Sequence, residues 1–590
     1  MKRFGTLLTA LAVASLVSSC SPMTTDQVWP HDLDAPPVTG RNGMVVSADA
    51  YATQVGVGIL ERGGNAVDAA IATSFALAVT YPTAGNIGGG GFMVLRLNDG
   101  SVGALDYRET APSGATRDMY LDEDGNVTNR SLFGALAAGV PGSVMGLWEA
   151  HRRFGSLPWA DLLQPAISLA EGFAVQESLH RGLTRVQARL DELDDELQTH
   201  FEATRNAFFP NGTVPELGET LSLPDLAKTL ERIRDNGPDG FYRGETADLI
   251  VREMEKDGGL ISHRDLADYT AEWREPIQFN YRDHTVISMP PVSSGGATMA
   301  EMANILMGYD LGSLQFDSAE RIHLMAEAMK RAYSDRNQYL GDPAFVEMPL
   351  DRMISPEYAE ERRADILPDR ATASEDVGPM LGSVDRGTNT THLSVVDADG
   401  NAVSVTTTIN TGYGSLVVVG GAGFLLNNEM DDFAAKPGTP NAYGLVQGEA
   451  NAIEGGKRML SSMTPSIVLD SEGDLKLVTG TPGGSTIITV VFQTISNAVD
   501  FGMNVSAVVN APRLHHQHLP DVIRLEEAGF SAATISELEG MGHTVQTVGG
   551  LGDIQAIMIM EDGTMAGASD PRGYGVAQAA SSQGAATDKQ

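Results

Sequence analysis

The chain has 590 residues, of which 77 are acidic and 40 basic, and its net charge at pH 7 is −37. This charge repels nucleic-acid phosphates and anionic lipid headgroups, so the composition argues against both as partners. The single cysteine, Cys20, excludes an intramolecular disulfide.

The N-terminus has the layout of a secretory signal. Lys2 and Arg3 precede an apolar run, Leu7 to Val17, which is too short to span a bilayer and leads through small residues to Cys20. This layout resembles a bacterial lipoprotein signal, which is cleaved before its cysteine and lipidated on the thiol. We expect a signal peptide over residues 1–19 and an exported protein, periplasmic or anchored to the outer membrane only through lipid on Cys20. A plain secreted protein is the alternative.

The segment after the signal is rich in proline and aspartate, and we expect a linker over residues 20–40. The first helix is predicted over Ala50 to Arg62, where two glycines end it. The next helix has Asn65 as its N-cap and Asp68 three residues later, which is the pattern of a capping box.

Four strand pairs are predicted around Asp-Gly or Glu-Gly turns, the pattern of antiparallel hairpins. They cover residues 92–105, 392–409, 466–478 and 554–566. Two adjacent threonines, Thr390 and Thr391, stand at the entrance of the second pair. On this window alone, ordinary strand threonines are the simpler explanation.

The middle of the chain is predicted to be mostly helical, roughly from Val144 to Asp265, and includes a long helix over Leu183 to Leu197. Another helix is predicted over Ala319 to Tyr333. Low complexity returns in residues 577–590, which we expect to be a disordered tail. Helices and antiparallel hairpins that occur in separate groups predict a layered α+β fold.

Three glycine-rich segments lie beside predicted strands: Gly88 to Gly91, Gly420 with Gly421, and Gly483 with Gly484. None has the spacing of a phosphate-binding loop, so the patterns argue against a nucleotide site. Glycine also allows backbone N–H groups to converge on a small anion, as an oxyanion hole requires, and TGTPGGST suits that role. A tight turn explains the same residues equally well.

Two other clusters invite a chemical interpretation. His515, His516 and His518 match no metal-binding signature and have no cysteine nearby, so we expect packing or solvated histidines and no metal. Ser461 and Ser462 lack the G-x-S-x-G context of an elbow nucleophile. They remain candidates for hydrogen bonding to a substrate.

Eight motifs follow one another along the chain after the signal. They are GNIGGGGFM (85–93), DYRETAP (106–112), SMPPVSSGG (288–296), YLGDP (339–343), TTHLSVVD (390–397), LLNNEMDDF (425–433), LSSMTP (460–465) and TGTPGGS (479–485). In number and order they resemble the γ-glutamyltranspeptidase family of N-terminal-nucleophile hydrolases. The resemblance implies a four-layer αββα sandwich with a mostly helical insertion in the large subunit. It also implies a large subunit over residues 41–389 and a small catalytic subunit over residues 390–576.

The same resemblance gives the paired threonines a chemical role. The first threonine of the TTH run, here Thr390, is both the site of self-cleavage and the nucleophile in the family. Its hydroxyl would attack the Asn389 carbonyl, and hydrolysis of the resulting ester would free an α-amino group on Thr390. Since an α-amino group titrates near pH ~7.7 to 8.0, it suits a general base close to neutrality.

The resemblance also assigns the remaining site residues one by one. It places Thr408 beside the nucleophile, and Gly483 and Gly484 in the oxyanion hole. The substrate-binding residues would be Asn410; Arg108, Ser461 and Ser462 for the α-carboxylate; Glu429 and Asp432 for the α-ammonium; and Tyr443 as the lid tyrosine. Met459 and Thr407 depart from the family pattern, which has proline and often tyrosine there.

The expected protein is an exported, self-cleaving γ-glutamyl transferase and glutathione hydrolase that needs no cofactor. It would act on glutathione and related γ-glutamyl compounds through Thr390, with water, amino acids or dipeptides as acceptors. Its large and small subunits would form a heterodimer from one precursor.

Two alternatives to this function stay open. One is a glutaryl-type β-lactam acylase, whose substrate has no ammonium for Asp432. The other is a non-catalytic surface lipoprotein, against which Thr390, Thr408 and the Gly483-Gly484 pair argue.

Overall fold

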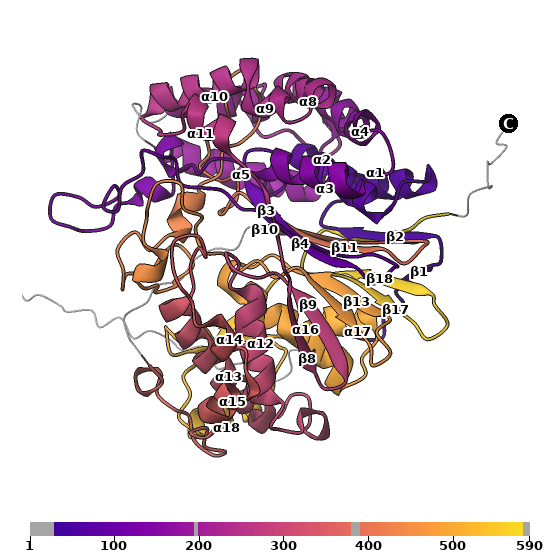
Figure 1. The fold of residues 1–590 in the computed structure, drawn as a ribbon, viewed down its shortest axis with the longest axis vertical. Helices are drawn as coiled ribbons and strands as arrows, with labels where there is room; N and C mark the ends of the chain where they lie inside the picture. Colours follow the sequence, from indigo (N-terminus) through magenta and orange to yellow (C-terminus); the bar gives the residue numbers. More distant parts are fainter. Residues whose placement is uncertain (1–28, 194–198, 379–389, 582–590) are drawn as a thin grey trace, which may run out of the picture.

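A computed structural model describes residues 29–193, 199–378 and 390–581 of the protein. Two seven-stranded sheets lie face to face at its centre, with a group of helices outside each (Figure 1). The layers therefore run helix, sheet, sheet, helix, which confirms the predicted αββα sandwich. Within the described ranges, no helix combines the length and the apolar character needed to cross a membrane. The predicted signal with Cys20, and Asn389 at the predicted cleavage site, lie outside these ranges.

All neighbouring strands in the two large sheets pair antiparallel. In order across the first sheet, the strands are β19 (Val576–Ala579), β2 (Gly43–Ser47), β10 (Thr390–Asp397), β11 (Ala402–Thr408), β3 (Gly90–Arg96), β4 (Val102–Tyr107) and β7 (Glu272–Arg274). In order across the second sheet, they are β1 (Val38–Gly40), β18 (Met565–Ser569), β17 (Gln555–Ile559), β13 (Leu475–Gly480), β12 (Ser466–Leu469), β9 (His284–Ser288) and β8 (Ile277–Tyr281).

One helical layer covers the first sheet and the other covers the second (Figure 1). The first layer contains α1 (Ala50–Glu61), α2 (Ala66–Thr80), α3 (Ser143–Phe154), α4 (Trp159–Glu171), α5 (Glu177–Asp191), α8 (Pro224–Asn236) and α10 (Gly244–Asp257). The second contains α12 (Gly295–Leu306), α13 (Ala319–Tyr339), α14 (Leu350–Met353), α15 (Pro356–Arg363), α16 (Ile487–Asp500), α17 (Val505–Asn510) and α18 (Ala532–Gly540).

The central strands are buried on both faces, and β2 shows how alternation divides their side chains between two cores. Val45 packs in the core formed with the first helical layer. Its neighbours Met44 and Val46 belong to the core formed with the second sheet and its helices. Because successive strand residues point to opposite faces, a strand between two covered faces needs apolar residues at every position.

The four predicted hairpins are confirmed as β3–β4, β10–β11, β12–β13 and β17–β18. The predicted capping box is also present: the Asn65 side chain accepts from the Asp68 N–H, and the Asp68 side chain accepts from the Asn65 N–H. The mostly helical middle is confirmed by the helices between α3 and α11 (His263–Asp268).

Several boundaries differ from the sequence-based prediction, among them the end of the helix predicted over 319–333, which continues to Tyr339 as α13. The expected linker ends early, because Val38–Gly40 forms edge strand β1 on β18. The expected disordered tail is wrong at its start, since Val576–Ala579 pairs with β2 and Ala580 is buried. The helix predicted over 183–197 is α5 (Glu177–Asp191), which begins and ends earlier. The two terminal segments form strands because their backbones pair with strands far away in the sequence. Local composition cannot predict such long-range pairing.

Candidate active site

One pocket is lined by every predicted site residue in the described part of the chain except Gly483. It lies where the strands end: Thr390 begins β10, Thr408 ends β11, and Gly480 ends β13 shortly before Gly483. Tight turns of the hairpins occupy the other end of these strands, where the Gly400 N–H donates to the Asp397 carbonyl and the Gly473 N–H to the Asp470 carbonyl. Antiparallel pairing thus brings segments far apart in the sequence to one edge of the sandwich.

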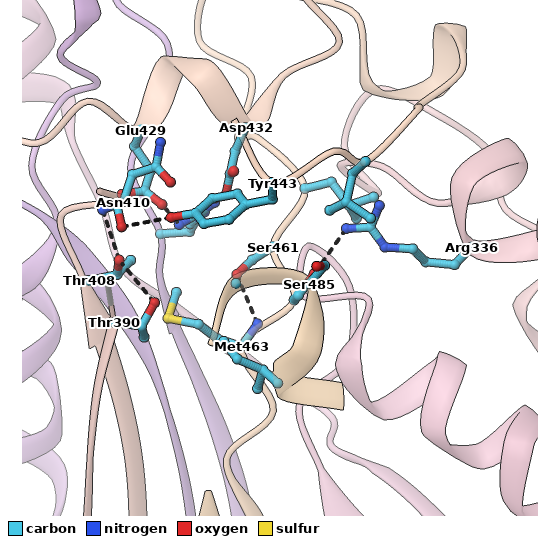
Figure 2. A pocket seen from close by; sticks show the side chains of 16 residues that line it. Arg336, Thr390, Thr408, Asn410, Glu429, Asp432, Tyr443, Ser461, Met463 and Ser485 are labelled. Carbon is cyan, nitrogen blue, oxygen red and sulfur yellow. Dashed lines mark hydrogen bonds and ion pairs between the residues drawn. The ribbon is translucent and has the colours of Figure 1, made fainter. Parts of the chain in front are cut away.

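Thr390 and Thr408 face each other across the β10–β11 ladder. Their hydroxyl oxygens lie 3.5 Å apart, at the outer limit of a hydrogen bond, and both residues are buried (Figure 2). The Asn410 N–H donates to the Thr408 hydroxyl oxygen at 2.8 Å. Thr408 is therefore held in place by the backbone that follows it, directly beside the predicted nucleophile.

Gly483 and Gly484 form a sharp turn between β13 and a short 3-10 helix, Gly484–Thr486, which runs directly into α16. Their φ values are 148° and 54°, which side chains rarely allow. A Cβ atom at Gly483 would lie 2.4 Å from the Thr486 hydroxyl, and one at Gly484 would lie 2.4 Å from the Tyr443 ring. Since the first N–H groups of a helix have no acceptor within the helix, this turn has the backbone donors that an oxyanion hole requires.

Tyr443 covers the pocket from the loop at residues 433–448, here called the Tyr443 loop. Its hydroxyl donates to the Asn410 carbonyl at 2.7 Å, and its ring packs on Gly484 (Figure 2). Tyr443 is 7% exposed. It therefore links the strand end that carries Asn410 to the predicted oxyanion hole.

Arg108 forms ion pairs with both Glu429 and Asp432. These two carboxylates come from a 3-10 turn, Glu429–Asp432, and the guanidinium also donates to the Met459 carbonyl at 3.2 Å. Arg108 is completely buried. The groups that the resemblance assigns to opposite ends of a substrate head thus neutralise one another in this structure.

Burial strongly affects the ionisation of the carboxylic acids in this cluster. It raises the pKa of Glu429 and of Asp432, and the nearby Arg108 guanidinium opposes that rise. Glu109 lies 3.7 Å from Arg108, and burial raises its pKa to about 7. A basic ligand group that entered the pocket would stabilise the ionised carboxylates.

The hydroxyl protons of Ser461 and Ser462 have no hydrogen-bond acceptor among the described residues. The Ser461 oxygen accepts from the Met463 N–H at 3.1 Å, and the Ser462 oxygen accepts from Arg336 at 3.2 Å. Neither hydroxyl donates to a protein group in the described ranges, so both O–H groups are available as donors for an anion.

Two buried acceptors in the same pocket lack any hydrogen-bond partner among the described residues. They are the Asn410 side-chain oxygen Oδ1 and the Glu429 carboxylate oxygen Oε2. A buried acceptor without a donor is costly, and in a pocket it marks a place for a ligand donor.

Sequence analysis missed Arg336, which lines the pocket from α13. It stands three residues before the YLGDP motif, in a helix whose buried residues occur on every face. Burial on every face distinguishes α13 from an ordinary surface helix, which has one exposed face. Charge alone gave no reason to single out one arginine among so many.

The histidine-rich segment lies behind the pocket. His515, His516 and His518 are buried, and their ring nitrogens contact Thr489, Gln517, Asp521, Ser374 and the His518 backbone. Burial lowers the pKa of His515 to about 3, so its ring is neutral near pH 7. The segment that carries these histidines reaches the Tyr443 loop through Gln517, whose amide donates to the Tyr443 and Gly444 carbonyls.

In the two other glycine-rich segments, the glycines allow a close backbone approach or a left-handed turn. A Cβ atom at Gly89 would lie 2.1 Å from the Thr408 carbonyl, so the glycine run at Gly88–Gly91 lets β3 approach the end of β11. Gly421 has a φ of 79° in a surface turn before Phe424. Of the two departures from the family pattern, Met459 accepts from Arg108 through its backbone carbonyl, and the Thr407 hydroxyl donates to the Gly90 carbonyl.

Known proteins resemble this chain over most of its length. The sequence model of the family described as gamma-glutamyltranspeptidase matches residues 52–580. Glutathione hydrolase proenzymes are 49% identical in Pseudomonas aeruginosa, over 97% of this chain and 98% of that one, and 48% identical in Escherichia coli, over 91% of each. A cephalosporin acylase from Bacillus halodurans matches with a TM-score of 0.82 and 30% identity, over 95% of this chain and all of the other.

Proposed function

The chain belongs to the γ-glutamyltranspeptidase family, and from that premise we propose that it cleaves itself before Thr390 and then transfers γ-glutamyl groups of glutathione and related compounds. Water would complete hydrolysis, and amino acids or dipeptides would act as acceptors for transfer. The observation that carries this proposal is the pair of buried pocket acceptors, Asn410 Oδ1 and Glu429 Oε2, for which the described residues offer no hydrogen-bond donor. A substrate ammonium group supplies the donors that both of them lack.

The charged cluster favours a substrate that carries both signs of charge. Arg108 is already neutralised by Glu429 and Asp432, so a lone carboxylate that took Arg108 would leave two buried acids without a cation. A γ-glutamyl head has a carboxylate and an ammonium on the same carbon. It can therefore exchange partners with all three residues and leave no buried charge uncompensated, while Ser461 and Ser462 donate to the carboxylate.

Self-cleavage and turnover would use the same hydroxyl. The Thr390 oxygen attacks the Asn389 carbonyl carbon, the peptide C–N bond breaks as the nitrogen takes a proton, and water hydrolyses the ester to leave a free Thr390 amine. In turnover, that amine takes the hydroxyl proton while the oxygen attacks the γ-carbonyl. The N–H groups of the Gly483-Gly484 turn would stabilise the oxyanion, and such donors contribute ~10² to 10³ in rate each.

The proposal is tested with a denaturing gel and a γ-glutamyl anilide. Wild type should give a chain ending at Asn389 and one of 590 − 389 = 201 residues beginning at Thr390, and it should release the aniline. Thr390→Ala should stay whole and inactive, whereas Thr391→Ser, at the neighbouring buried position, should be cleaved normally. An active wild-type chain that remains intact would contradict the mechanism.

An acylase is the second candidate, because the similar acylase structure covers nearly the whole chain. A glutaryl substrate has no ammonium to occupy the acceptors beside Asp432. Wild type that cleaves glutaryl anilide as fast as γ-glutamyl anilide would favour the acylase.

We further propose that the protein is exported and anchored through lipid on Cys20, as the lipoprotein-like signal suggests. Several acyl chains anchor a protein stably where one does not. Wild type should partition into the detergent phase, and Cys20→Ala should abolish that partitioning. Unmodified wild type in the aqueous phase would refute the anchor.

A further inference from the structure

Arg336 is a buried cation without a carboxylate partner in the described part of the chain. Its side chain is inaccessible to solvent, and none of the ion pairs there includes it. It donates instead to four neutral oxygens: Ser294 Oγ at 3.1 Å, Asn337 Oδ1 at 3.0 Å, Gln447 Oε1 at 3.4 Å and Ser462 Oγ at 3.2 Å. Buried arginines are usually paired with an anion, so this arrangement calls for a missing partner.

The side chain of Arg336 places its positive charge at the wall of the pocket. It lies in the last turn of α13, where the negative end of the helix dipole favours a cation. It enters the pocket from the side away from Thr390 and Thr408 (Figure 2). One terminal nitrogen donates a single hydrogen, to Ser462, and its second hydrogen has no acceptor within residues 29–193, 199–378 and 390–581.

The contact with Ser462 fixes the direction of that hydroxyl. Because the Ser462 oxygen accepts from Arg336, its own proton points elsewhere, and no protein acceptor in the described ranges takes it. Arg108, the cation assigned to the same substrate group, is shared between Glu429 and Asp432. The pocket thus has one arginine held by acids and one held only by neutral groups.

We infer that Arg336 is a positioning residue for the substrate's α-carboxylate: it orients the Ser462 hydroxyl toward that group and provides, behind it, a positive charge that forms no ion pair within the described ranges. The inference rests on the proposed γ-glutamyl transfer. It also accounts for the charge of the pocket lining, in which Arg108 and Arg336 balance Glu429 and Asp432, so that a zwitterionic head leaves the balance unchanged.

Two anilides separate this role from a structural one. γ-Glutamyl anilide has the α-carboxylate, whereas 4-aminobutyryl anilide has the same chain and amine without it. Arg336→Met should lower the ratio of their kcat/KM values by about 10- to 100-fold, the usual effect of losing a charge-assisted hydrogen bond. The loss should appear as a raised KM for the γ-glutamyl compound, with kcat and 4-aminobutyryl cleavage little changed. Arg336→Lys, which keeps the charge, should restore part of the ratio.

Arg321 provides a matched control on the same helix. It is also buried without an acidic partner in the described ranges, but it packs on Phe316 and Phe501, away from the pocket. Arg321→Met should leave the substrate ratio unchanged even if it lowers stability.

The outcomes distinguish the inference from the function on which it rests. A wild type that prefers γ-glutamyl anilide, together with an Arg336→Met variant that keeps the full preference, would overturn the role of Arg336 alone. A wild type without activity on γ-glutamyl anilide would overturn the proposed function first. If Arg336→Met does not fold, Arg336→Lys decides: a lowered ratio supports the inference, and an unchanged ratio refutes it.

Discussion

At the residue scale, the pocket holds carboxylates in surroundings that disfavour their charge. Glu429 and Asp432 are buried against Arg108, and burial raises the pKa of each. Arg108 contacts both acids directly, and the more distant Arg336 also favours the ionised form of Asp432, so a ligand ammonium group would add to their stabilisation. This makes Asp432 a sensitive position for testing recognition of an ammonium group.

We predict that Asp432→Ala will cripple turnover of γ-glutamyl anilide but not self-cleavage, which uses Thr390 and its own backbone. Removing one partner of a buried charge pair costs ~2 to 5 kcal/mol, or roughly 30-fold to several-thousand-fold in affinity. Steady-state kinetics and a denaturing gel of the same preparation give both readouts.

Glutaryl anilide serves as the control, because it has no ammonium for Asp432 to bind. Its slow cleavage should be nearly unaffected by Asp432→Ala. In wild type, protonation of the two acids as pH falls through their raised pKa values should raise KM for the γ-glutamyl compound only. Equal effects of the substitution on both anilides would show that Asp432 acts on structure instead.

At the element scale, the segment around His515 joins two parts of the site. Gln517 accepts from the Ser485 hydroxyl at 2.8 Å and donates to the carbonyls of Tyr443 and Gly444 at 3.3 and 3.2 Å. Since carbonyls only accept, the amide nitrogen must face them, and its oxygen is left for Ser485 and the neutral His515 ring. One amide thus ties the base of the Tyr443 loop to the turn of the predicted oxyanion hole.

We predict that Gln517→Met will raise KM for γ-glutamyl anilide and lower the free energy of unfolding by roughly 1 to 3 kcal/mol, the cost of leaving buried groups unpaired. The Tyr443 loop would lose its two backbone contacts while side-chain length is preserved. Kinetics and denaturant unfolding measure the two effects.

Gln493 is the matched control, a buried glutamine on α16 that donates to the Thr489 and Leu514 carbonyls and, within the described ranges, makes no hydrogen bond to the Tyr443 loop. Gln493→Met should lower stability and leave KM unchanged. If both variants change KM alike, Gln517 has no special link to the loop.

At the scale of the whole molecule, the two predicted subunits interleave in both sheets. In the first sheet, β10 lies between β2 from the large subunit and β11 from its own, and β19 pairs on the far side of β2. In the second, β12 from the small subunit lies beside β9 from the large one. Each core therefore contains residues of both subunits.

We predict that cleavage before Thr390 will leave one compact particle. Size exclusion without denaturant should give a single peak that contains both chains, and the chains should separate only when the fold is lost, because the shared cores and strand ladders hold them together. The uncleaved Thr390→Ala protein supplies the reference elution volume. Separate elution of the wild-type chains in native buffer would contradict the interleaved arrangement.

Short-range signals along the chain specify the local elements, and the motifs predict much of the chemistry. Asp-Gly and Glu-Gly turns between β-branched runs specify the hairpins, and Asn65 with Asp68 specifies a helix start, because these signals act over a few neighbouring residues. The motif series identified most of the polar residues that line the pocket, with Thr390 at the start of a strand. The long-range partners became evident only in the folded protein: β1 and β19 as edge strands, Arg108 between Glu429 and Asp432, and Arg336 behind Ser462. Strand pairing and buried charges depend on residues hundreds of positions apart, so their contacts exist only once both sheets and their helical layers have packed together.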